Sequence, residues 1–87
     1  MNLSYFKNEN SALIASFQFT NFKEAFRFMT EVAATAEHLQ HHPEWKNVYN
    51  KVEICLRTHD ANNTVTDKDY LLAAAIETII ENYKFKI

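Results

Sequence analysis

Residues 12–39 read ALIASFQFTNFKEAFRFMTEVAATAEHL, and the spacing of their apolar residues changes part-way along. In the first eight residues, apolar side chains at 13, 15, 17 and 19 share one face, with Ser16 and Gln18 on the other, which predicts a half-buried strand. From Phe22 onward, apolar residues recur every three or four positions, as on one face of a helix. The apolar stripe of this predicted helix comprises Phe22, Ala25, Phe26, Met29, Val32, Ala33, Ala36 and Leu39. The stretch therefore predicts a strand followed by an amphipathic helix of about five turns.

Both ends of this helix carry sequence signals. Asn21 is a favourable N-cap residue, and Glu24 follows three positions later, close to a capping box. Pro43 is the only proline in the chain. Its ring disfavours the α conformation of His42, so the helix is expected to end before these residues.

Further elements flank this unit on both sides. Leu3–Phe6 predicts a short strand that ends in the polar residues 7–11. After the proline, Glu44–Tyr49 and Val52–His59 predict two more strands, joined by a tight turn at Asn50-Lys51 because Asn tolerates positive φ.

The last part of the chain predicts a polar loop and a second helix. Residues 60–65 form the loop, and Thr66 with Asp69 caps the helix. The apolar stripe of this helix comprises Leu72, Ile76, Ile79, Ile80 and Tyr83. The order β-β-α-β-β-α predicts the α+β class, with a four-stranded antiparallel sheet and two helices packed on one face. No linker or repeat interrupts the chain, so residues 1–87 are expected to form a single domain.

Composition excludes several classes of protein. The 87 residues are 47% hydrophobic and 14% aromatic, too rich in core formers for a disordered segment. No apolar run reaches the ~18 residues of a membrane span, and residues 1–5 lack the features of a signal peptide. A net charge of −2 argues against direct nucleic acid binding, and the absence of glycine excludes P-loops and dinucleotide fingerprints. The single cysteine cannot form an internal disulfide, so we expect a cytoplasmic protein.

All four histidines lie within positions 38–59. His38, His41 and His42 crowd the end of the first helix, and His59 ends the fourth predicted strand. A pocket lined by several imidazoles can donate and accept protons near neutral pH. A histidine near a helix C-terminus also interacts favourably with the helix dipole, and we expect His38 to be such a surface residue. For His41 and His42 both interpretations stay open, and His59 could be a polar strand end.

Other candidates are weaker. A zinc site on three histidines is not expected, because His41 and His42 leave the helix end in different directions and no HExxH spacing or second cysteine supports them. Cys55 is most simply a small filler or an inert thiol. Asp69 is most simply the capping partner of Thr66. Trp45 shares a strand face with Tyr49, a position that is more often core than pocket wall.

The segment Glu37–Val52, EHLQHHPEWKNVYNKV, resembles the pterin-4a-carbinolamine dehydratase family. The family pattern is a glutamate, His-His-Pro, an aromatic residue, a further histidine and an aspartate. Here these places are held by Glu37, His41, His42, Pro43, Tyr49, His59 and Asp69. The Phe-rich stretch Phe22–Met29 is also similar to the first helix of the family.

Three differences from the family are visible. The extra N-terminal helix with which the family usually opens is not expected in this chain. Gln40 stands where an acidic residue is common, and the loop after His59 lacks glycine and is about one residue longer. All three motif histidines remain in place.

The resemblance implies elimination of water from 4a-hydroxytetrahydropterin to give quinonoid dihydropterin, which recycles the tetrahydrobiopterin-type cofactor of aromatic amino-acid hydroxylases. This chemistry needs an acid and a base but no metal and no cofactor. We expect His41 and His59 to be the acid–base pair and His42 to orient the pterin substrate. The remaining expected contacts are Glu37 holding the His41 imidazole, Pro43 and Trp45 against the flat pterin, and Thr58, Asp60 and Ala61 at its polar edge. Strict strand alternation puts His59 opposite the apolar face, so it can meet His41 only where the sheet ends.

The resemblance leaves other roles open. Animal members of the family also serve as dimerisation cofactors of a homeodomain transcription factor, and a related chain could act in molybdopterin metabolism. The intact histidine set favours the enzyme. The aromatic stripe of the first helix, with Phe28 expected at its exposed margin, favours a homodimer or homotetramer.

Overall fold

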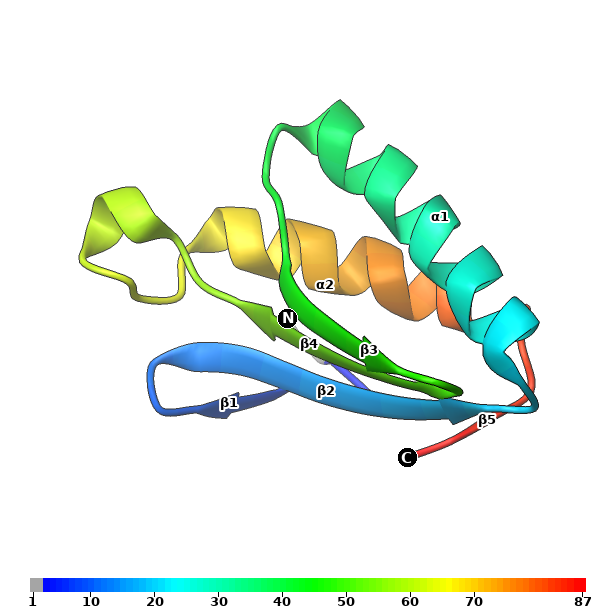
Figure 1. Ribbon diagram of the computed structural model, residues 1–87. Coiled ribbons are helices and arrows are strands. Elements are labelled where there is room, and N and C mark those ends of the chain that lie inside the picture. Colours follow the sequence, from blue (N-terminus) through cyan, green and yellow to red (C-terminus); the bar gives the residue numbers. More distant parts are fainter. Residues whose placement is uncertain (1–2) are drawn as a thin grey trace.

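The computed structural model describes residues 3–87 as a twisted antiparallel sheet with two helices on one face (Figure 1). The elements are β1 (Lys7–Glu9), β2 (Ala12–Phe19), α1 (Phe22–Leu39), β3 (Glu44–Val48), β4 (Lys51–Leu56), a short 3-10 helix (His59–Ala61), α2 (Asp67–Ile80) and β5 (Phe85–Lys86). The strands lie in the order β1-β2-β4-β3, and β5 pairs with the end of β2. The predicted α+β class and element order are confirmed.

The core lies between the sheet and the two helices. Strand β2 is central, and its alternating residues Leu13, Ala15, Phe17 and Phe19 are all buried. The helices cover them with Ala25, Phe28, Val32 and Ala36 from α1 and Leu72, Ala73, Ile76 and Ile80 from α2. Burying one large apolar side chain contributes about 1.5–3 kcal/mol to the stability of the fold. Each element therefore turns inward the face on which its apolar residues recur.

Helix α1 is rotated relative to the sequence-based expectation. Phe28 is fully buried, with its ring 5.0 Å from that of Phe19 and 5.7 Å from that of Phe17. The expectation that Phe28 would lie at an exposed margin is therefore wrong. The apolar stripe is wider than the face that the sheet can cover, and Phe22 and Phe26 are instead left 46% and 52% exposed.

The N-terminal segment differs from the prediction as well. The strand is Lys7–Glu9, which pairs with β2, and Leu3–Phe6 forms no strand. The Glu77 carboxylate on α2 instead accepts hydrogen bonds from the backbone N–H groups of Ser4, Tyr5 and Phe6, at 2.8, 2.6 and 3.0 Å. One side chain thus satisfies three donors that a strand would have given to its neighbour.

We expect Glu77→Gln to lower the free energy of unfolding by about 1–3 kcal/mol, because the amide has one acceptor oxygen in place of two and turns an N–H group toward backbone donors. Urea unfolding measures the change. Glu9→Gln, on the exposed strand β1, is the control and should stay within about 0.5 kcal/mol of the original chain. Equal losses in the two variants would show that Glu77 does not anchor the N-terminal segment.

The turns are built without glycine. Within residues 3–87, six residues have positive φ: Asn10, Ser11, Gln40, Tyr49, Asn62 and Asn63. The β3–β4 turn is centred on Tyr49-Asn50, one residue earlier than predicted, and β4 begins at Lys51. Tyr49 is consequently 63% exposed and does not share a strand face with Trp45. No helix within residues 3–87 has the length and apolar character needed to span a bilayer.

Candidate functional site

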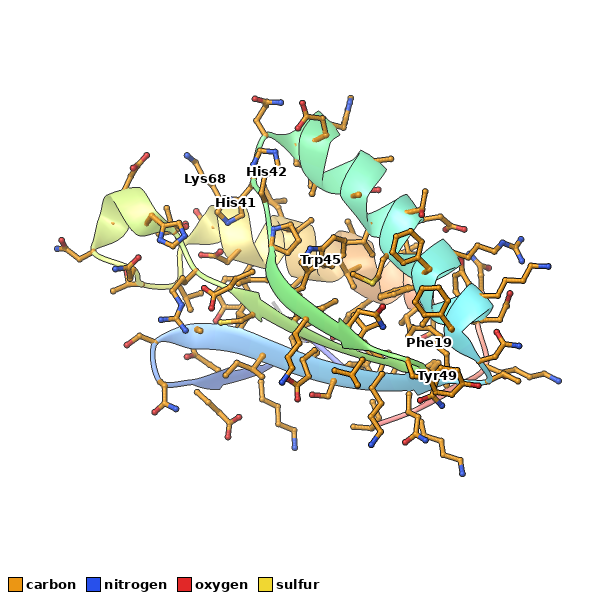
Figure 2. All side chains as sticks on the ribbon, viewed as in Figure 1. Phe19, His41, His42, Trp45, Tyr49 and Lys68 are labelled. Atoms are coloured by element: carbon orange, nitrogen blue, oxygen red, sulfur yellow. The ribbon has the colours of Figure 1, made fainter. Side chains whose placement is uncertain are left out.

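A cavity of about 480 Å³ opens where α1 ends, β3 begins, β4 ends and α2 begins. Its lining residues are Gln40, His41, His42, Pro43, Glu44, Arg57, Thr58, His59, Asp60 and Lys68. Figure 2 shows His41, His42 and Lys68 at this end of the molecule, far from Phe19 and Tyr49 at the other. Three of the four histidines thus converge here, and His38, exposed on the last turn of α1, does not line the cavity.

Gln40 ends helix α1 and sets the path of the chain into the site. Its backbone is left-handed, with φ 54° and ψ 41°, and the N–H of His41 donates to the carbonyl of Ala36 at 3.1 Å. This is the geometry of a Schellman cap, which usually has glycine at the left-handed position. The Gln40 side-chain amide donates to the Glu37 carbonyl at 2.7 Å, which supports the conformation. The turn directs the next two histidines away from the helix axis.

His41 binds a buried carboxylate. Its Nε2 lies 2.6 Å from Oδ1 of Asp69, whose side chain is fully buried at the start of α2. The other oxygen, Oδ2, accepts from the Thr58 hydroxyl at 2.8 Å and from the backbone N–H of Thr66 at 2.9 Å. Asp69 therefore caps the helix, as predicted, and also holds an imidazole, which the sequence did not indicate.

This network fixes the tautomer of His41. An ionised carboxylate only accepts hydrogen bonds, so His41 Nε2 carries the proton that is donated to Asp69. The Thr58 hydroxyl gives its proton to Asp69 and accepts one from Thr66, whose Oγ1 lies 2.6 Å away. Nδ1 is consequently the ring nitrogen of His41 left to exchange a proton with a bound molecule.

His42 pairs with Glu37 instead. Its Nε2 lies 2.8 Å from Oε1 of Glu37, and both side chains are exposed. The hydrogen bond from His42, and then its charge, hold the pKa of Glu37 below its ordinary value. The expectation that Glu37 holds His41 is therefore wrong, because helix α1 ends before His41 and the reversal at Gln40 breaks the spacing on which that expectation was based.

His59 enters the cavity from a 3-10 turn. Strand β4 ends at Leu56, three residues earlier than predicted, so strand alternation no longer fixes the direction of His59. Its Nδ1 lies 2.6 Å from Oδ1 of Asn63. An amide oxygen only accepts, so Nδ1 is the protonated nitrogen of the neutral ring and Nε2 is free to act as a base.

The remaining expected contacts divide into two groups. Pro43, Thr58 and Asp60 line the cavity, whereas Trp45 and Ala61 do not. Trp45 lies opposite Ile54 and packs against the core. The Thr58 hydroxyl is occupied by Asp69.

Sequence reasoning missed Arg57 and Lys68 in the cavity wall. Lys68 directly precedes Asp69 in the first turn of α2, and this position next to a motif residue is the signal that could have placed Lys68 near the site.

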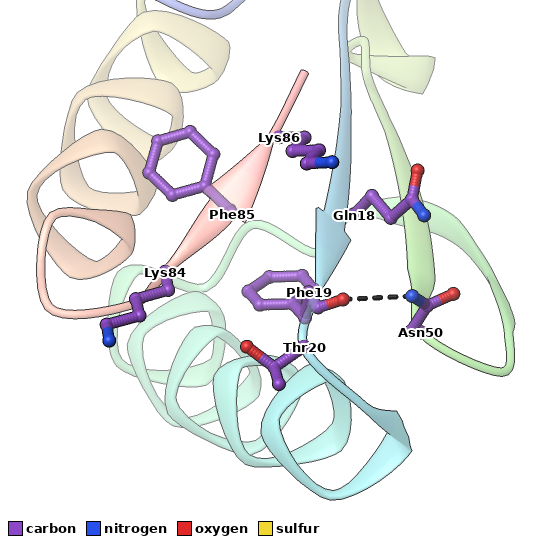
Figure 3. A pocket seen from close by; sticks show the side chains of 7 residues that line it. All are labelled: Gln18, Phe19, Thr20, Asn50, Lys84, Phe85 and Lys86. Atoms are coloured by element: carbon purple, nitrogen blue, oxygen red, sulfur yellow. Dashed lines mark hydrogen bonds between the residues drawn. The ribbon is translucent and has the colours of Figure 1, made fainter.

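A second depression, of about 380 Å³, lies at the opposite end of the sheet (Figure 3). It is lined by Gln18, Phe19, Thr20, Asn50, Lys84, Phe85 and Lys86, and the Asn50 amide donates to the Phe19 carbonyl at 2.9 Å. None of these side chains is an imidazole or a carboxylate, so it has no acid–base pair like that of the histidine cavity. Over residues 3–87, no three His, Cys, Asp or Glu side chains are grouped to hold a metal ion.

The chain matches a known family over most of its length. Residues 3–79 match the family described as pterin 4 alpha carbinolamine dehydratase. The chain belongs to this family. The cavity contains His41, His42, Pro43 and His59, the residues on which the resemblance of the sequence to the pterin carbinolamine dehydratases rests.

Two curated relatives carry the name "Putative pterin-4-alpha-carbinolamine dehydratase". The protein of Christiangramia forsetii is 61% identical over 67 residues, which cover 77% of this chain and 68% of that protein. The protein of Rhizobium etli is 55% identical over 67 residues, which cover 77% of this chain and 65% of that protein.

Two solved structures share the fold. A transcriptional coactivator/pterin dehydratase from Brucella melitensis is 40% identical, with a TM-score of 0.82 over 88% of this chain and 83% of that one. A pterin dehydratase-like protein identified as a RuBisCO assembly factor in the alpha-carboxysome has a TM-score of 0.69 over 90% of this chain and 89% of that one. The latter is 18% identical and supports the fold alone.

Proposed function

We propose that this chain is a dehydratase that eliminates water from a 4a-hydroxytetrahydropterin to give quinonoid dihydropterin, recycling the cofactor of aromatic amino-acid hydroxylases. The observation that carries the proposal is the convergence of His41, held by buried Asp69, and His59, held by Asn63, on one cavity. Both belong to the family motif, and each leaves one ring nitrogen free.

The reaction breaks the bond between the 4a carbon and its hydroxyl oxygen. The departing oxygen takes a proton and leaves as water, while the neighbouring ring nitrogen loses a proton and forms a double bond to the 4a carbon. The electrons stay within the pterin, so the protein has only to supply one proton and remove another. General acid–base catalysis of this kind contributes about 10²–10⁴-fold.

In this proposal each histidine of the cavity has its own part in the exchange. His41 acts through Nδ1 and His59 through Nε2, because the other nitrogen of each ring is taken by Asp69 or Asn63. His42, on the exposed side with Glu37, orients the substrate, and Pro43 provides an apolar wall.

A direct assay tests the proposal. The purified chain is mixed with 4a-hydroxytetrahydropterin, and formation of quinonoid dihydropterin is followed by stopped-flow absorbance. We expect the rate to rise in proportion to protein concentration and to remain after treatment with a chelator. A rate equal to that of buffer alone would refute the dehydratase activity. We further propose a cytoplasmic location, where the single thiol of Cys55 would remain reduced.

A second role, in protein interaction, is favoured by the exposed aromatic pair on α1. The rings of Phe22 and Phe26 stack at 5.6 Å and are about half exposed, at 46% and 52%. Exposed apolar patches of this kind mark contacts between proteins. We propose that a second copy of this chain covers them in a homodimer or homotetramer.

Light scattering at micromolar concentration tests this association, and we expect a mass at least twice 10.2 kDa. Phe26→Ser should lower the measured mass, since it removes half of the stacked pair. Leu71→Ser, on the equally exposed Leu71 of α2, is the control and should not. A mass near 10.2 kDa for the original chain would refute self-association through α1.

A further inference from the structure

Arg57 has an unusual environment at the edge of the histidine cavity. It follows the last residue of β4 and is half-buried, on the same side of the strand as Cys55. Its Nη2 donates to the Cys55 sulfur at 3.1 Å, which holds the guanidinium against the sheet. Glu44 lies opposite Cys55 in the β3–β4 register. Arg57 and His42 both line the cavity.

The guanidinium is incompletely satisfied. Among residues 3–87, Nε of Arg57 is the one fully buried side-chain nitrogen or oxygen that has no hydrogen-bond partner. Arginine stays charged in proteins, so its Nε keeps its proton and remains a donor without a partner. The hydrogen bond to Cys55 raises the pKa of Arg57 further, and the nearby Glu44 charge acts in the same direction. A ligand in the cavity would reach the guanidinium through its Nη groups rather than through the enclosed Nε, and of these Nη2 already donates to Cys55.

Lys68 supplies a second cation to the same cavity from the first turn of α2. Within the described residues, neither Arg57 nor Lys68 is in an ion pair. The carboxylates that hold the histidines are already engaged, Glu37 with His42 and Asp69 with His41.

Two further carboxylates, Glu44 and Asp60, also line the wall, and neither pairs with either cation. The cavity wall therefore carries two cations that form no ion pair with a carboxylate of the described chain.

We propose that Arg57, together with Lys68, binds an anionic group on the side chain of the pterin, a phosphate or a carboxylate, and so selects the substrate of the proposed dehydratase. This inference rests on the proposed function for the identity of the ring. The pterin ring lies among the histidines, and its substituent extends toward the end of β4. Arginine suits this task because its planar donors match both anions.

Binding of three stable 7,8-dihydropterins tests the inference. One probe carries a neutral dihydroxypropyl side chain, one the same side chain with a phosphate, and one a carboxylate at the same ring carbon. Their dissociation constants are measured by fluorescence quenching. We expect at least one anionic probe to bind about tenfold more tightly than the neutral one, and the tighter anion identifies the natural group.

The matched variants are Arg57→Met and Arg27→Met. Arg27 lies on the exposed side of α1, where it pairs with Glu24 at 3.6 Å. Arg57→Met should remove the preference for the anionic probe, Arg57→Lys should keep part of it, and Arg27→Met should keep all of it.

Four outcomes would overturn the inference: equal constants for the three probes, a preference that survives Arg57→Met, no binding of any probe, or inorganic phosphate binding as tightly as the phosphorylated probe. Dehydration of a neutral carbinolamine without any anion preference overturns this inference and leaves the proposed function in place. An anion preference without dehydration overturns the proposed function and leaves this inference in place.

Discussion

Replacing His41 by alanine is expected to lower kcat for dehydration of 4a-hydroxytetrahydropterin by about 100-fold, the effect of losing a general acid or base. The fold should survive, because His41 lies at the boundary between α1 and β3 and contributes no apolar contact to the core. Stopped-flow absorbance measures kcat, and circular dichroism checks the fold. His59→Ala should lower kcat by at least about tenfold for the same reason.

His38 provides the control for this experiment. It is exposed on the last turn of α1, three residues from His41, and does not line the cavity. His38→Ala should therefore change kcat by less than about twofold, within the range of an ordinary surface substitution. Comparable losses in the His38 and His41 variants would mean that the proton is exchanged elsewhere.

The second large effect is expected from Asp69→Asn. The amide presents one oxygen and one NH₂ group, so it cannot accept from His41, Thr58 and the backbone of Thr66 together. The NH₂ group facing Nε2 of His41 would impose the opposite tautomer and place a proton on Nδ1. We expect kcat to fall by about 10–100-fold and the free energy of unfolding to fall by about 2–3 kcal/mol.

Asp67→Asn is the matched control, since Asp67 lies in the same first turn of α2 but is exposed. Its stability should change by less than about 1 kcal/mol through the helix dipole, and its kcat should not change. Nitrogen-15 NMR of the His41 ring reports the tautomer directly. An unchanged His41 spectrum in Asp69→Asn would show that the carboxylate serves only the helix.

Most of the fold could be predicted from periodicity. Strand β2 and helix α1 were placed correctly because their apolar residues recur at clear intervals of two and of three or four. The first strand was misplaced because Leu3–Phe6 is apolar for another reason: Tyr5 and Phe6 pack on Phe17 while Glu77 takes the backbone donors. That contact spans most of the chain and leaves no local signal.

The site residues were identified by the resemblance, but their partners were not. Glu37 and His41 are four apart, a spacing that pairs them only if the helix continues through both. The left-handed backbone of Gln40 ends the helix between Glu37 and His41. A glycine at this position would have predicted the left-handed conformation, whereas a glutamine does not. Arg57 was missed because alternation places it on the outer face of β4 with Cys55, and the sequence does not show that the cavity extends to this residue.

The double use of Asp69 makes the proposed activity depend on one end of a helix. Oδ2 of Asp69 accepts hydrogen bonds from the backbone of Thr66, at the start of α2, and from the Thr58 hydroxyl. Oδ1 of the same carboxylate accepts from His41. Helix ends open locally at a smaller free energy than the whole domain unfolds. Each such opening would break the hydrogen bond between Asp69 and the His41 imidazole, and the proposed activity would be lost while the core stays folded. On heating, turnover should therefore decline several degrees before the sheet melts.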